Sequence, residues 1–129
     1  MLTLTEIFAI IIIHWIADFV FQDEKRALGK SKNWNDLLYH TITYSMIIWT
    51  LSMNLFLPNP EFAVLGFQLA SITFIFHTIT DYFTSRIVSK KFENKHYGSP
   101  IPNFGAFTII GIDQVLHYIQ LFTTYYLLK

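Results

Sequence analysis

The sequence predicts an all-α fold, a bundle of four transmembrane helices, on three observations. The 129 residues are 53% hydrophobic and only 14% charged, whereas soluble domains carry about 25% charged residues. The apolar residues gather in four runs, each near the roughly 20 residues that a helix needs to cross a bilayer. Positive charges are confined almost entirely to two connections between these runs. The length allows one domain, so we expect a single transmembrane domain over residues 1–129.

The four expected helices lie at residues 4–21, 37–57, 62–87 and 104–128. We expect the first to stay in the protein, because no early Lys or Arg and no small-residue cleavage site mark a signal peptide. Asn33 or Asn35 is suited to cap the second helix, since an Asn side chain accepts hydrogen bonds from the first backbone N–H groups.

The distribution of Lys and Arg predicts the orientation. Every Lys and Arg except Lys129 lies in or beside the connections at 22–36 and 88–103, and the turn Pro58-Asn59-Pro60-Glu61 has none. The positive-inside rule places both basic connections in the cytoplasm. Both termini then lie on the non-cytoplasmic side of a multi-pass protein of the inner (cytoplasmic) membrane. Residues 96–102 are rich in turn formers and are expected to form a surface loop, with a lid or re-entrant loop over the site as the alternative.

Composition also excludes several classes of function. The formal net charge is zero, whereas a nucleic-acid-binding protein shows a basic face. The chain has no cysteine, so disulfides and thiolate metal sites are excluded. We therefore expect no nucleic-acid partner.

The most informative feature is a set of ionisable residues inside the apolar segments. Three Asp residues each have a His four positions away, and a further His opens the second segment. The set is His14 with Asp18, His77 with Asp81, Asp113 with His117, and His40. A spacing of four places two side chains on one helix face. Ionisable groups inside a membrane face the bundle interior and usually serve a function.

The depths of these groups predict that they meet. With a rise of about 1.5 Å per residue, the seven groups fall about 5 to 20 Å from the cytoplasmic ends of their helices. His and carboxylate ligands on facing helices form metal sites in other bundles. The alternatives are a proton or ion relay and hydrogen bonds that only hold the helices together.

The ligand set favours one or two divalent ions, with Zn first and Mn, Fe or Ni as alternatives. All seven residues are candidate metal ligands: His14, Asp18, His40, His77, Asp81, Asp113 and His117. Asp113 and His117 either complete a second metal position or act in catalysis as general base and orienting partner. Gln22 and Gln114 are candidates to orient ligands, and Arg86 and Lys25 are candidates to hold a substrate anion.

The motifs resemble those of a family of small bacterial and phage polytopic membrane proteins catalogued as a domain of unknown function. The resemblance rests on His14-x-x-x-Asp18-Phe19-x-x-Gln22, His40, His77-x-x-x-Asp81 and Asp113-Gln114-x-x-His117. The His-x-x-x-Asp pattern is also similar to that of membrane-bound metal-dependent hydrolases, a similarity that implies metal-dependent hydrolysis.

The leading hypothesis is a metal-dependent hydrolase that acts on a lipid or phosphoester at the cytoplasmic leaflet, with metal activation of water as its mechanism. A proton or metal-ion transporter and a metal-stabilised structural or regulatory subunit stay open. Membrane lipid is the expected partner, and the exposed helix surfaces leave room for a homodimer.

Overall fold

A computed structural model describes residues 1–98 and 104–129 of the chain. Within these residues the protein is entirely helical and has no strand, which confirms the predicted all-α class. The helices are α1 (Leu4–Trp15), α2 (Glu24–Gly29), α3 (Trp34–Ser52), α4 (Phe62–Glu93) and α5 (Ala106–Leu128), with a π-helical segment, η1 (Ile16–Val20), after α1 and a 3-10 segment, η2 (Met53–Phe56), after α3. Part of the expected loop at 96–102 lies outside the described residues.

The structure contains five helices in its described residues rather than the predicted four. The additional helix, α2, begins where the Asp23 side chain accepts a hydrogen bond from the Arg26 N–H. Six residues are too few to show a hydrophobic period, so the sequence pattern missed it. Asn33, not Asn35, caps α3 by accepting from the Asp36 N–H at 2.8 Å. The third expected helix continues beyond residue 87 to Glu93.

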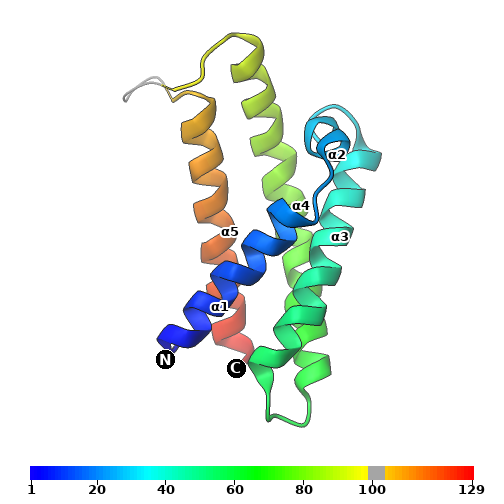
Figure 1. The fold of residues 1–129 in the computed structure, drawn as a ribbon, viewed down its shortest axis with the longest axis vertical. Coiled ribbons are helices and arrows are strands. Elements are labelled where there is room, and N and C mark those ends of the chain that lie inside the picture. Colours follow the sequence, from blue (N-terminus) through cyan, green and yellow to red (C-terminus); the bar gives the residue numbers. More distant parts are fainter. Residues whose placement is uncertain (99–103) are drawn as a thin grey trace.

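The long helices run up and down along the longest axis of the molecule (Figure 1). α4 packs against both α3 and α5, and α1 crosses obliquely and packs against the same two neighbours. Both termini lie at the end of the bundle that holds the turn between α3 and α4. The basic connection that contains α2 and the end of α4 lie at the opposite end. The described chain therefore separates its basic connections from its termini, as the sequence predicts.

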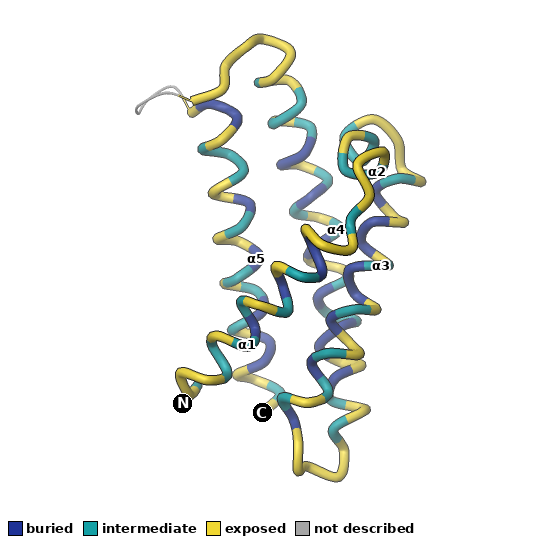
Figure 2. The backbone as a smooth tube through the Cα atoms, viewed as in Figure 1, coloured by how far each residue is buried: buried dark blue, intermediate teal, exposed yellow. Residues whose placement is uncertain are grey.

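The burial pattern differs from that of a soluble bundle (Figure 2). In the described residues, fourteen polar or charged side chains are buried, compared with eleven hydrophobic ones. Large Ile, Leu and Phe side chains instead cover the outside of α1, α4 and α5. Much apolar surface therefore stays outside the core in the described residues.

The apolar part of the core lies toward the end that holds the termini. It includes Ile48, Leu69, Leu121 and Tyr125, which fall in the halves of their helices nearest that end. The buried His and Asp side chains lie farther along the same helices, toward the basic end.

One helix of the described residues, α4, is long and apolar enough to cross a membrane by length and composition. α1 is shorter because the π-helical segment interrupts it after twelve residues. α3 begins with Trp34-Asn35-Asp36 and carries buried His, Ser and Thr, and α5 carries buried Asp, His and Thr, which lower the hydropathy of both helices. This criterion alone supports one span rather than the four that the sequence predicts.

Tyr125 joins three segments at the terminal end, which leads to a stability prediction. Its fully buried hydroxyl lies 2.8 Å from Glu6 Oε1 and 3.0 Å from the Leu55 carbonyl oxygen. We expect Tyr125→Phe to lower the free energy of unfolding by about 1 to 3 kcal/mol, because partly buried acceptors lose their donor. Thermal unfolding in detergent, followed by circular dichroism, measures the loss. The control is Tyr126→Phe at the exposed neighbouring position, and equal effects of the two variants would contradict the prediction.

Candidate metal centre

All seven candidate side chains are buried in the middle of the bundle. They come from every long element: His14 from α1, Asp18 from η1, His40 from α3, His77 and Asp81 from α4, and Asp113 and His117 from α5. Residues four positions apart lie about one helical turn apart and share a helix face. Both members of each pair therefore point toward the interior. The convergence expected from the sequence is present in the structure.

The first group of possible ligands consists of Asp18, His40 and His77. His40 Nε2 lies 3.3 Å from Asp18 Oδ1 and 3.1 Å from His77 Nε2. Asp81 Oδ2 adjoins the same atoms, 3.1 Å from His40 Nε2 and 3.6 Å from His77 Nε2. Four nitrogen and oxygen donors thus lie close together, and they come from three different parts of the chain.

The second group consists of His77, Asp81 and His117. His117 Nε2 lies 3.3 Å from Asp81 Oδ1 and 3.4 Å from Asp113 Oδ2. The two oxygens of Asp81 therefore face different groups, since Oδ2 lies beside His40 and Oδ1 beside His117. Asp81 and His77 belong to both sets of donors, so the two groups are joined.

The donor set fits a divalent metal ion. Ligand bonds of about 2.0 to 2.2 Å in a tetrahedral site place neighbouring donors roughly 3.3 to 3.6 Å apart, and the separations here are 3.1 to 4.0 Å. Hydrogen bonds alone do not account for the cluster, because a neutral imidazole carries one N–H and His40 Nε2 has three close neighbours. Asp18 Oδ1 is buried and forms no hydrogen bond to the described residues. These buried groups could hold a metal ion.

His14 lies beside this cluster, with both ring nitrogens occupied by other residues. Its Nδ1 is 2.6 Å from the Tyr44 hydroxyl and its Nε2 is 2.9 Å from Gln114 Oε1. A neutral His14 can accept from Tyr44 and donate to Gln114, which satisfies both nitrogens. Of the seven candidate ligands, His14 and Asp113 belong to neither three-residue group.

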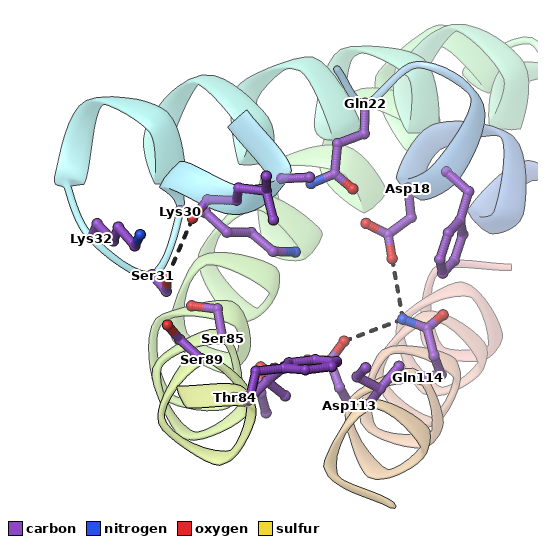
Figure 3. Close-up of a pocket in the computed structure, with 16 residues that line it drawn as sticks. Asp18, Gln22, Lys30, Ser31, Lys32, Thr84, Ser85, Ser89, Asp113 and Gln114 are labelled. Carbon is purple, nitrogen blue, oxygen red and sulfur yellow. Dashed lines mark hydrogen bonds between the residues drawn. The ribbon is translucent and has the colours of Figure 1, made fainter. Parts of the chain in front are cut away.

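Gln114 connects His14 with two carboxylates. Its Nε2 donates to Asp18 Oδ2 and to Asp113 Oδ2, each at 3.2 Å (Figure 3). Gln114 thereby turns the other oxygen of Asp18 toward His40, which is the orienting position that the sequence analysis expected. Gln22, the second expected orienting residue, has a buried Nε2 with no hydrogen-bond partner among the described residues.

A cavity of about 370 Å³ adjoins the cluster between η1, α2, α4 and α5 (Figure 3). Asp18, Asp113 and Gln114 line it on one side, and Lys30, Lys32 and three serines line it on the other. The carboxylates at the edge of the metal groups are therefore within reach of a bound molecule.

The comparison with family models connects this arrangement to known sequences. Residues 7–129 match the model of the family described as "Protein of unknown function (DUF3307)". The chain belongs to this family. No curated protein and no solved structure matches it.

The structure of this DUF3307 protein places the two candidate anion-binding residues away from the cavity. Arg86 donates to the Tyr82 carbonyl oxygen at 2.7 Å and lies over the Tyr82 ring, 3.7 Å from its centroid. Lys25 is exposed on α2. Neither lines the cavity, whereas Lys30 and Lys32 do.

Three residues of this DUF3307 site were missed by the sequence analysis. Tyr44 stacks on His77 with ring centroids 3.9 Å apart, and Thr84 donates to Asp113 Oδ1 at 2.6 Å. Their positions, four after His40 and three after Asp81, are a helical signal that could have found them. Lys30 lies in a connection, and no spacing rule predicts its contact with α4.

Lys30 brings a positive charge into the cluster. Its ammonium lies 2.8 Å from Asp81 Oδ2, and its side chain is largely buried. Burial alone lowers the pKa of Lys30, but the Asp81 and Asp18 carboxylates outweigh it and hold that pKa above its ordinary value. Lys30 is therefore charged at neutral pH, and it lies between the cavity and the cluster.

Proposed function

We propose that the protein spans the inner membrane with its four long helical segments and keeps both termini on the non-cytoplasmic side. The apolar outer surface supports this proposal, since lipid tails solvate such side chains and water does not. The buried polar interior supports it as well, because ionisable groups in a membrane face the bundle interior. The exposed side chains include Phe8, Ile12, Trp15, Phe19, Ile75, Phe76, Ile79, Phe83, Val115, Leu116 and Ile119.

We further propose that the protein is a metal-dependent hydrolase that acts on a lipid phosphoester at the cytoplasmic leaflet. The observation that carries this proposal is the position of the joined ligand groups beside a cavity that Asp18 and Asp113 also line. Asp18, His40, His77, Asp81 and His117 are the residues that would hold one or two divalent ions, with Zn favoured by the His and carboxylate donors. A closed structural site would have no such cavity next to its ligands.

The residues around the cavity suggest how hydrolysis would proceed. A bound divalent ion supplies Lewis-acid activation of water and of a phosphoryl oxygen. Asp113 is positioned to take a proton from the attacking water, since it lines the cavity and is held by Thr84 and Gln114. The water oxygen bonds to phosphorus, the ester P–O bond breaks, and the departing oxygen takes up a proton. The products are an alcohol and a phosphate.

The test combines metal analysis with phosphate release. We expect the detergent-purified protein to contain about one or two equivalents of metal and to release inorganic phosphate from lysophosphatidic acid or from two-chain phosphatidic acid in mixed micelles. Chelation followed by dialysis should abolish release, and added Zn²⁺ should restore it. Metal-free protein, or release that chelation leaves unchanged, would contradict the proposal.

A second function, a proton or metal-ion conduit, is favoured by one feature. Gln120 bonds to both Thr73 and Thr124 at 3.0 Å, so hydrogen-bonding side chains continue from the cluster toward the terminal end. Thr73 lies one turn from His77, and Gln120 lies three residues after His117. Metal-dependent proton or Zn²⁺ flux through proteoliposomes, without phosphate release, would favour the conduit over the hydrolase.

A further inference from the structure

We propose that the cavity binds a phosphomonoester carrying a single alkyl or acyl chain, with the phosphate between Lys32 and Ser85 and the chain along Leu28 and Phe92. This inference rests on the proposed function, because it requires a divalent ion beside the cavity. It adds the class of substrate and the residues that recognise each part of it.

Buried donors without partners indicate the phosphate position. Ser85 is only 9% exposed, and its hydroxyl has no hydrogen-bond partner among the described residues. Gln22 Nε2 is in the same situation. Both residues line the cavity with Lys30 and Lys32. A buried donor that stays unpaired is destabilising, and phosphate oxygens accept several hydrogen bonds at once, so a phosphate would satisfy these donors.

The charges make phosphate binding depend on the metal. Asp18 and Asp113 line the same cavity and would repel an anion, while Lys30 is already paired with Asp81. A divalent ion among the ligands offsets the carboxylates and leaves Lys32 and Lys30 to favour the anion. Ion and phosphate therefore strengthen each other's binding, since such coupling is reciprocal.

The apolar lining indicates a chain next to the phosphate. Phe19, Leu28, Val88, Phe92 and Ile110 line the cavity. Phe19 is 52% exposed and belongs to the outer surface that we assign to lipid, and Leu28 is 67% exposed on α2 at the basic end, so the apolar lining extends from the basic end to that surface. An alkyl chain can leave the cavity there without entering water.

The volume favours a substrate with one chain. Pockets for drug-sized ligands measure roughly 300 to 1,000 Å³, and this cavity of about 370 Å³ lies near the lower end. It has room for a phosphate and the first part of a single chain. A two-chain phosphodiester would need to place a second chain and a headgroup in the same space.

The experiment measures binding of octylphosphonate, whose C–P bond is not hydrolysed, to the Zn²⁺-loaded protein by isothermal titration calorimetry. We expect its Kd to be at least about 10-fold lower than that of inorganic phosphate, because burying several CH₂ groups adds about 0.8 kcal/mol each. We expect no binding to chelated protein. Inorganic phosphate that binds as tightly would show that the site recognises free phosphate and would overturn the single-chain assignment.

Variants then separate the two parts of the site. Lys32→Gln and Ser85→Ala should each raise the Kd of octylphosphonate about 3- to 10-fold, since each removes one partner of a charged group. Leu28→Ser should weaken octylphosphonate but not inorganic phosphate. The matched control is Lys25→Gln, which removes the same charge outside the cavity and should change neither Kd. An equal loss in Lys25→Gln and Lys32→Gln would overturn the assignment, because it would indicate general attraction to the basic end.

Metal content distinguishes the failure of this inference from failure of the proposed function. Each variant should retain the Zn²⁺ content of the parent, which also shows that it is folded. Protein that holds Zn²⁺ and releases phosphate from two-chain phosphatidic acid but not from lysophosphatidic acid, and does not bind octylphosphonate, overturns the single-chain substrate and leaves the hydrolase proposal standing. Protein that holds no Zn²⁺ overturns both.

Discussion

Replacing His77 with Ala is expected to remove the bound metal and to weaken metal affinity by more than about 100-fold. His77 belongs to both ligand groups, so its loss removes a donor from each. Even residues that only orient metal ligands typically change affinity 10- to 100-fold, and a ligand shared by two positions should matter more. Elemental analysis of the purified variant, together with competition against a chelator of known affinity, measures the change.

The His77→Ala experiment needs two controls. One tests whether the variant still folds, and the other tests whether replacing any histidine lowers the metal content. His77 also stacks on Tyr44 and His117, so His77→Gln, which keeps more of the side-chain volume, should be examined beside His77→Ala. His96→Ala is the matched control, because His96 is an exposed histidine outside the ligand groups. Full metal content in both His77 variants would remove the basis of the proposed centre.

Asp113→Asn is expected to lower kcat for phosphate release by about 100- to 10,000-fold, the range typical for loss of a general base, with little change in KM. The Asn side chain keeps the shape of the carboxylate beside Thr84 and Gln114 but cannot take a proton from water. Steady-state kinetics with lysophosphatidic acid in mixed micelles separates kcat from KM.

Metal analysis of Asp113→Asn decides between two functions of this carboxylate. Unchanged metal content with reduced kcat is the result expected of a proton acceptor. Loss of one of two metal equivalents would instead identify Asp113 as a ligand of a second ion beside His117. Glu24→Gln, at an exposed position on α2, is the control and should keep the parent kcat. An active Asp113→Asn variant with full metal content would exclude the proposed base.

The sequence predicted the all-α class and the convergence of seven ionisable groups, because both follow from helical periodicity. His77 and Asp81 had to share a face once their segment was helical, and the apolar surroundings indicated that this face was internal. The spacing could not show which partner each group would choose. His14 and Asp18 also lie four residues apart, yet His14 contacts Tyr44 and Gln114 while Asp18 lies beside His40.

The other differences arise where tertiary contacts decide the structure. Lys30 reaches Asp81 across 51 positions in the sequence, and only the path of the connection through α2 makes this contact possible. For the same reason the sequence indicated Lys25 and Arg86 as anion-binding candidates, whereas Lys30 and Lys32 are the basic residues that line the cavity. Arg86 had a nearer partner in the ring and carbonyl of Tyr82, which the sequence pattern did not reveal.

The π-helical segment η1 gives the first helix one place where its length can change without moving its buried side chains. The Phe21 N–H donates to the Ile16 carbonyl oxygen at 3.2 Å, five residues back, so this turn contains one residue more than an α-helical turn. Deleting one residue here would restore ordinary α-helical geometry with little rotation of α1, because the turn loses only its extra residue; in a regular α-helix the same deletion would rotate the preceding turns by about 100°, given 3.6 residues per turn. Ile10 and His14 would then keep their places in the interior, so a one-residue deletion in η1 would cost this protein less than the same deletion in its other helices.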